Sequence, residues 1–155
     1  MLHIALYQPE IPPNTGNIIR LCANTGCALH LIEPLGFTLD DKKLRRAGLD
    51  YREFAAVQTH GSLAAFYDSA SPRRLFAFTT RGHRRYSDVR YEPQDALLFG
   101  PETRGLPDAL LKQLGDSHCL RIPMQPDSRS LNLSNAVALV TYEALRQLDF
   151  PGLQP

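Results

Sequence analysis

The chain has 155 residues, of which 43% are hydrophobic and 21% are charged. This length suits one folded domain with one core, and the composition excludes a disordered chain. The net charge of +1 excludes an acidic or polycationic tail, although basic residues can still gather locally. Apolar runs are too short to span a bilayer, and the N-terminus lacks the pattern of a signal peptide. We therefore expect a cytoplasmic protein that does not enter a membrane.

The first half of the chain is predicted to alternate short strands with helices. Residues 2–7 form a buried strand, and a helix follows from about Asn14 or Thr15, which can cap it, to about Asn24. The other elements predicted here are a strand at 28–32, a basic helix capped by Asp40 and ended by Gly48, a strand at 55–59 and a helix at 62–69.

The second half continues the same alternation. Strands are predicted at 75–79, 96–99 and 119–122, a helix opens at Pro107, and a long apolar helix covers 133–148. The polar stretch 80–94 is predicted to be a surface loop. Short apolar runs without alternation, separated by helices, are typical of a parallel sheet covered on both faces. The predicted fold class is therefore α/β, with a mostly parallel sheet and helices on both faces.

The cysteines and histidines do not form a metal-binding pattern. Cys22, Cys27 and Cys119 are an odd set without C-x-x-C spacing, and the five histidines are scattered without H-E-x-x-H. The cysteines are interpreted as reduced, buried, small apolar residues. We expect no metal.

The loop at 100–105 follows a predicted strand and carries one acid and one base between two glycines. Its G-x-x-x-x-G spacing is half of a P-loop, but Leu106 and Pro107 stand where that motif requires Lys and Ser or Thr. An NTPase is thereby excluded, and no G-x-G-x-x-G supports dinucleotide binding. The alternative for this stretch alone is an ordinary turn between strand and helix.

The loop at 123–135 is rich in hydroxyl and amide side chains and leads directly into the long apolar helix. This polar density predicts a ligand-binding loop, and the alternative is helix capping by Asn132 or Ser134. The helix itself is apolar nearly all round, which predicts burial on several sides and favours a role in a dimer interface.

Positive charge is local. Arg20 shares a helix face with Asn17 and Asn24, which on its own is typical of a solvated face. Two denser groups suit a phosphate backbone, with a solvated surface as the alternative. They are Lys42, Lys43, Arg45 and Arg46, and then Arg81, His83, Arg84 and Arg85 with Arg73 and Arg74 nearby.

Three of these segments together resemble the SPOUT superfamily of S-adenosylmethionine-dependent RNA methyltransferases, in its ribose 2′-O-methylating branch. The motifs occur in order over essentially the whole chain, which makes the combination far more specific than any one of them. The matching residues are Asn14, Gly16 and Arg20 in N-x-G-x-x-x-R, Gly100, Glu102 and Gly105 in G-x-E-x-x-G, and residues 122–124 and 130–134 in I-P-M and S-L-N-x-S.

The resemblance implies 2′-O-methylation of the wobble nucleotide, cytidine or uridine 34, of leucine tRNAs. It also implies one SPOUT domain over residues 1–155 without a separate RNA-binding domain, a trefoil knot in the C-terminal half, and a homodimer with the active site at or across its interface. The anticodon stem-loop of tRNA is the implied partner. The alternatives are methylation at another tRNA or rRNA site, or an RNA-binding module of the same fold without activity.

The resemblance also assigns roles to single residues. Arg20 would lie beside the ribose hydroxyl, Glu102 is the rival proton acceptor, and Asn132 would order its loop. A guanidinium seldom loses its proton, so we prefer Arg20 as a hydrogen-bond donor that stabilises the developing alkoxide. The methyl donor would contact Phe78, Gly100, Ile122, Ser130 and Leu131. RNA would contact Arg20, Lys42, Lys43, Arg45, Arg46 and Arg84, and Tyr142 would lie in the dimer interface.

Overall fold

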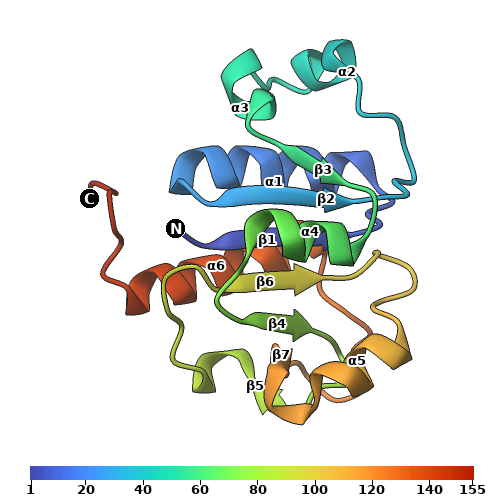
Figure 1. Cartoon of the computed structure of the whole chain (residues 1–155), viewed down its shortest axis with the longest axis vertical. Helices are drawn as coiled ribbons and strands as arrows, with labels where there is room; N and C mark the ends of the chain where they lie inside the picture. The colour runs from blue at the N-terminus through green and yellow to red at the C-terminus, as the bar shows by residue number, and fades with distance from the viewer.

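A seven-stranded sheet, parallel at every pairing, forms the centre of the molecule (Figure 1). The computed structural model describes residues 1–155, apart from the side chain of Tyr51. The strand order is β3-β2-β1-β6-β4-β7-β5. The strands are β1 (His3–Tyr7), β2 (Ala28–Ile32), β3 (Gln58–His60), β4 (Leu75–Phe78), β5 (Arg84–Arg85), β6 (Ala96–Phe99) and β7 (Cys119–Arg121).

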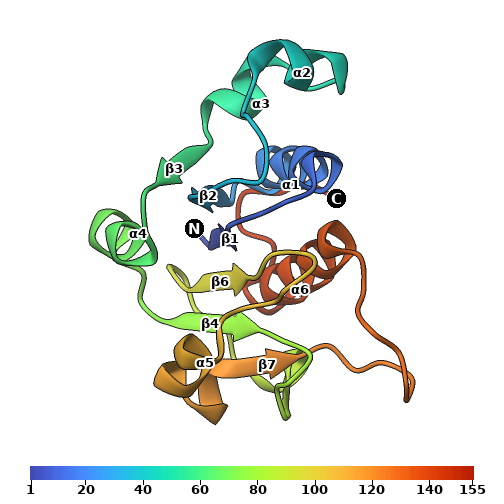
Figure 2. The same ribbon diagram turned by 90° about the vertical axis from the view of Figure 1, so that its right-hand side faces the viewer.

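Helices cover both faces of the sheet, which confirms the α/β prediction. Figure 2 shows α1 (Pro12–Thr25) and α6 (Leu133–Gln147) on one face, with α4 (Leu63–Ala70) and α5 (Asp108–Leu114) on the other. The short helices α2 (Asp41–Arg46) and α3 (Tyr51–Ala55) lie beyond α1, near the β3 edge. No helix among the described residues is long and apolar enough to cross a bilayer.

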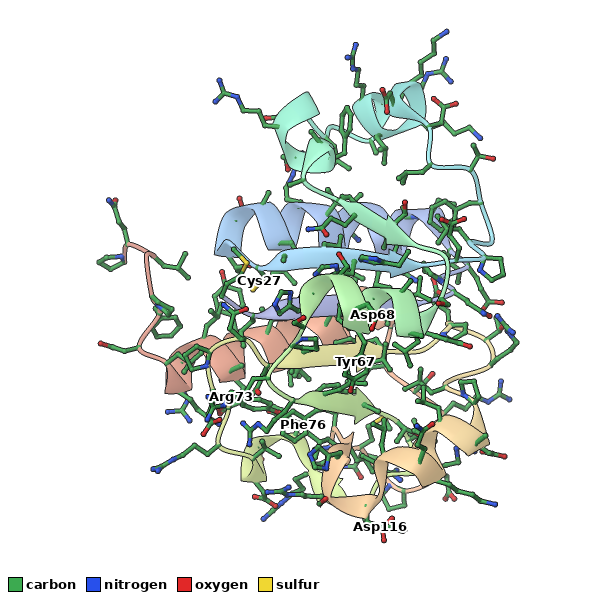
Figure 3. The ribbon with its side chains drawn as sticks, in the orientation of Figure 1. Cys27, Tyr67, Asp68, Arg73, Phe76 and Asp116 are labelled. Atoms are coloured by element: carbon green, nitrogen blue, oxygen red, sulfur yellow. The ribbon has the colours of Figure 1, made fainter. Side chains whose placement is uncertain are left out.

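Two apolar clusters, one on each face of the sheet, form the core. Ile4 and Leu6 of β1 pack in the cluster that contains α1 and α6, whereas Ala5 belongs to the cluster beneath α4 and α5. A central strand with both faces covered needs apolar side chains at every position, which explains the lack of alternation in the sequence. The three cysteines are free and buried, as expected, and Cys27 is labelled in Figure 3.

Three element boundaries differ from the sequence expectation. Helix α1 begins at Pro12 with Ile11 as its N-cap and no side-chain cap, so the predicted capping by Asn14 or Thr15 is wrong. Proline fits the first helical turn because the N–H it lacks there would be unpaired anyway. Both supposed caps are instead buried inside the helix.

The other two differences lie at 51–60 and 80–94. A capping box between Asp50 and Glu53 starts α3, so the strand predicted at 55–59 begins later, as β3. The stretch 80–94 contains β5 and a 3₁₀ turn (Tyr86–Asp88), and Val89 and Tyr91 pack in the core. It is therefore not simply a surface loop.

A chain of three buried histidines crosses the first three strands. Nδ1 of His3 lies 3.0 Å from Nε2 of His30, and Nδ1 of His30 lies 2.9 Å from Nε2 of His60. The chain ends at Gln94, whose Oε1 lies 3.0 Å from Nε2 of His3. The oxygen of Gln94 accepts from Nε2–H of His3. With neutral rings, each Nε2 along the chain donates and each shared Nδ1 accepts, so all the ring contacts are satisfied.

Stability should therefore fall as the solution becomes acidic. Burial lowers the pKa of His30 to about 4, with the charges of His3 and His60 adding to the effect, and burial also lowers the pKa of His60. Between about pH 6.5 and pH 4 the unfolded chain binds more protons, so the free energy of unfolding decreases. We expect His30 to account for a loss of about 2–3 kcal/mol between pH 7 and pH 4.5.

Urea unfolding at a series of pH values measures this effect. His30→Phe, compared with an exposed control such as His83→Phe, should show a shallower pH dependence below pH 6.5. Equal slopes for the two variants would contradict the assignment.

Candidate active site

A cavity of about 1120 Å³ lies where strands β1, β4, β6 and β7 end. Its walls come from the segments after these strands and from the loop before α6. The carboxyl edge of a parallel sheet is the usual place for a ligand in α/β proteins. All five residues expected to contact the methyl donor line this one cavity, namely Phe78, Gly100, Ile122, Ser130 and Leu131.

The loop after β6 owes its tight course to two glycines. A Cβ on Gly100 would lie 2.6 Å from the backbone N of Leu106, a clash that only glycine avoids. Gly105 has a φ of 68°, in the left-handed region that favours glycine. The loop therefore turns back on itself at the cavity, which gives both glycines of G-x-E-x-x-G a structural reason.

Glu102, between those glycines, is engaged by three donors. Its carboxylate accepts hydrogen bonds from the backbone N–H of Glu10 and of Ile11, both at 2.8 Å, and from Nδ2 of Asn14 at 3.2 Å. The carboxylate of Glu10 in turn accepts hydrogen bonds from the backbone N–H and hydroxyl of Thr103, which lower the pKa of Glu10. Glu102 thus ties the loop after β6 to the start of α1.

Asn14 and Asn132 extend this connection to the third motif. Nδ2 of Asn132 donates to Oδ1 of Asn14 at 3.0 Å, and Asn14 is only 6% exposed. Oδ1 of Asn132 accepts from the backbone N–H of Ser134 and of Asn135 and so caps α6. The capping alternative is confirmed for Asn132, and the same side chain also lines the cavity. The structure therefore brings together one residue from each motif.

Arg20 does not line this cavity. Its Nε donates to Oε2 of Glu53 at 2.8 Å, and its Nη2 also contacts the carbonyl oxygen of Gly48. The Arg20 side chain is 47% exposed and lines a second cavity on the other side of the first turns of α1. Sequence reasoning missed Glu53, although its place in the sequence pattern D-x-x-E, a capping box, was a readable signal.

The two basic groups differ in how far they are neutralised. Lys42, Lys43, Arg45 and Arg46 are exposed on α2, and none forms an ion pair with another described side chain. Figure 3 shows the α2 side chains projecting away from the body of the molecule. In the second group, Arg84 donates to the carbonyl oxygen of Ser117. Its neighbours pair with carboxylates, as Arg81–Asp108, Arg85–Asp88, Arg73–Glu92 and Arg74–Asp95.

Helix α6 is buried on one side only, so the prediction of burial on several sides is wrong for the single chain. Val137, Val140 and Ala144 are buried, whereas Leu139 is 38% exposed and Tyr142 is 45% exposed. Ile11 and Leu131, which line the cavity, are also exposed apolar residues. No group of His, Cys, Asp or Glu among the described residues is arranged to hold a metal ion.

Residues 1–142 match the SpoU rRNA Methylase family. The chain belongs to this family. A tRNA (cytidine(34)-2'-O)-methyltransferase of Escherichia coli K12 is 63% identical over 152 residues, which cover 98% of this chain and 97% of the relative. A solved structure that concerns the 2-OH methylation of C/U34 on tRNA is 49% identical, with a TM-score of 0.86 over 96% of this chain and 97% of the other.

A second solved structure contains the methyl donor. It is the SpoU methyltransferase AviRb of Streptomyces viridochromogenes in complex with the cofactor AdoMet, and it is 27% identical to this chain. The TM-score is 0.79, and the match covers 96% of this chain and 58% of AviRb. The family relationship and the AdoMet complex agree with the expected donor class.

Proposed function

We propose that the chain is a tRNA methyltransferase that uses S-adenosylmethionine to methylate the 2′-hydroxyl of cytidine or uridine 34 in leucine tRNAs. The observation that carries the proposal is that Asn14, Glu102 and Asn132, one residue from each motif, meet by hydrogen bonds at one cavity at the carboxyl edge of the sheet. The name of the 63% identical relative supports the same nucleotide. Leucine tRNA as the substrate rests on the motif resemblance alone.

The residues around the cavity suit the methyl donor. The rings of Phe78 and Phe99 stack with their centroids 4.7 Å apart and form an apolar wall. Gly100 has no side chain, so a ligand can approach the backbone closely at this point. Phe78, Gly100, Ile122, Ser130 and Leu131 would hold the donor in the apolar part of a cavity whose other walls carry polar and charged side chains. When bound, S-adenosylmethionine supplies a methyl group already made electrophilic by the sulfonium.

Arg20 then acts on the RNA. Its guanidinium donates hydrogen bonds to the 2′-hydroxyl or the adjoining phosphate and stabilises negative charge as the hydroxyl oxygen develops it. The hydroxyl proton would pass to solvent water as the bond between the oxygen and the methyl carbon forms and the bond between that carbon and the donor sulfur breaks. Glu102 serves to position the loop, because three donors already occupy its carboxylate.

A second copy of the chain would complete the site. Arg20 lies outside the donor cavity of its own chain, so we propose that the active site forms across a homodimer interface containing α6 and Tyr142. The exposed Leu139 and Tyr142 on α6, with Ile11 and Leu131 beside the cavity, support this interface.

We extend the proposal to the other features that the resemblance implies. These are one methyltransferase domain over residues 1–155, a trefoil knot in the C-terminal half, an anticodon stem-loop as the RNA partner, and a cytoplasmic location. The knot rests on the motif resemblance.

The test is to incubate the protein with labelled S-adenosylmethionine and total tRNA from a strain that lacks the gene. Label on the ribose of nucleotide 34 in leucine tRNAs is the expected result. Label at another tRNA or rRNA position would keep the activity and replace the substrate. RNA binding without donor binding or transfer would instead indicate a binding module without activity.

The α2 cluster, which consists of Lys42, Lys43, Arg45 and Arg46, should contribute more to RNA affinity than the arginines of the second basic group, which pair with carboxylates. The double variant Lys42→Ala/Arg46→Ala should weaken tRNA binding about tenfold and lower the slope of log K against log[salt] by about 1–2, because unpaired cations release counterions from phosphate. Filter binding at several salt concentrations measures both quantities. The matched control Arg73→Ala/Arg85→Ala, whose arginines already pair with Glu92 and Asp88, should bind nearly as well as the unchanged chain. Equal losses would contradict the assignment of α2.

A further inference from the structure

A second cavity, of about 410 Å³, lies between the start of α1 and the segment that leads into and includes α2. Figures 1 and 2 both show α2 and α3 beyond α1, past the β3 edge of the sheet. The cavity walls are mainly apolar and include Pro12, Leu39, Leu44 and Leu49. The cavity shares no lining residue with the donor cavity, so it is a separate place for a ligand.

Gly16 keeps this cavity open. It lies inside α1, where glycine makes a helix less stable than alanine does, and its φ is not in the left-handed region. A Cβ added there would meet only Cδ1 of Leu49, at 4.0 Å, which is ordinary contact. Packing within the chain therefore does not require glycine at this position. The space that a side chain would occupy is the cavity itself.

One polar side chain at the walls is available to a ligand, the exposed amide of Asn17. Thr15 also lines the cavity, but it is only 1% exposed and its hydroxyl oxygen is buried beneath the wall, out of reach of a ligand.

Positive charge borders the cavity on two sides. The unpaired positive charge comes from Lys43 on α2, whereas the guanidinium of Arg20 on the other side is paired with Glu53, which fixes its position at the wall. A polyanionic backbone that follows α2 would thus pass the mouth of an apolar cavity.

We propose that this cavity binds the base of the nucleotide whose ribose is methylated. A base has flat apolar faces and a polar edge, which match the apolar walls and the exposed amide of Asn17. The base is joined to the ribose carbon next to the one that carries the 2′-hydroxyl. A base in this cavity therefore brings that hydroxyl to Arg20. The inference rests on the proposed function, since it takes Arg20 to act at the target ribose.

The test compares two anticodon stem-loops, one intact and one with an abasic ribose at position 34. Gly16→Leu fills the cavity and should weaken binding of the intact RNA about tenfold, within the range for loss of one base contact. The abasic RNA should bind the unchanged protein about tenfold more weakly. The abasic RNA should bind Gly16→Leu as weakly as it binds the unchanged protein, because it has no base that the leucine could exclude from the cavity. Gly61→Leu, at a glycine with open space around it, is the matched control.

Each outcome decides the proposal separately from the proposed function. If the Gly16→Leu variant and the removal of the base each lowered the RNA affinity and the two losses added, the base would bind elsewhere and the inference would be overturned. Full affinity of Gly16→Leu for the intact RNA would overturn it as well. Gly16→Ala provides a second check, because it should raise the melting temperature while it weakens RNA binding and leaves the dimer and donor affinity unchanged. Loss of the dimer in Gly16→Ala would assign the glycine to subunit packing and overturn the inference. Absence of methyl transfer by the unchanged protein would instead reject the proposed function.

Discussion

Arg20→Ala is expected to lower the rate of methyl transfer by about 100-fold or more and to leave the affinity for S-adenosylmethionine unchanged. The reason is spatial, because Arg20 lies outside the donor cavity of its own chain and, of the two substrates, would contact the RNA. Single-turnover transfer and calorimetry of donor binding measure the two quantities. Arg20→Lys keeps the charge but loses the planar pair of donors, so it should recover only part of the rate. Unchanged turnover of Arg20→Ala would reject the role of this residue.

The same variant tests whether two chains share a site. Mixed with Gly100→Leu, which blocks the donor cavity, Arg20→Ala would form heterodimers with one intact site, built from the Arg20 of one chain and the donor cavity of the other. Random mixing of equal amounts should restore about a quarter of full activity, since half of the dimers are mixed and each has one working site. No recovery from the mixture of two folded, dimeric variants would contradict a shared site.

Glu102→Gln should destabilise the fold and weaken the binding of S-adenosylmethionine. The carboxylate accepts hydrogen bonds from the N–H groups of Glu10, Ile11 and Asn14. The amide nitrogen of glutamine would face at least one of these N–H groups, so a hydrogen bond to a charged acceptor would be replaced by repulsion between two N–H groups. We expect the free energy of unfolding to fall by about 2–3 kcal/mol. Urea unfolding and calorimetry measure the two effects. The control is Asp68→Asn at an exposed carboxylate labelled in Figure 3, and it should show neither effect.

The rival hypothesis, in which Glu102 accepts the proton of the ribose hydroxyl, predicts a different result. Glu102→Gln would then fold and bind the donor normally but lose methyl transfer. That outcome would contradict the positioning role and return Glu102 to the chemistry. A pH–rate profile adds a further distinction, because a positioning residue leaves the pH dependence of transfer unchanged.

The strands in the middle of the sheet could be predicted from the sequence because their local pattern and their burial agree. Residues 28–32 and 96–99 are continuous apolar runs, and both are strands with those bounds. The cap at Asp40 was also readable, since its carboxylate accepts from the N–H of Lys42. At 51–60 the capping box of Asp50 and Glu53 outweighs the apolar run that suggested a strand.

The candidate site was predictable only in part. Motif spacing placed Gly100, Glu102 and Asn132 near one another, and the structure confirms that they line one cavity. The partners of Glu102 could not be read from the sequence, because they lie at the start of a helix far away along the chain. The separation of Arg20 from the donor cavity depends on which side of α1 faces α2, and local patterns do not specify such packing.

The hydrogen bonds that unite the three motifs also bear on when the site can form. The bond between Asn14 and Glu102 joins residues 88 positions apart, and the bond between Asn132 and Asn14 spans 118 positions. Contacts between residues so distant in sequence carry a large loop-closure entropy and form late in folding. A chain growing on the ribosome has α1 and β1 long before it has α6. The donor cavity would therefore be assembled only at the end of synthesis, and an incomplete chain would be unable to bind the methyl donor.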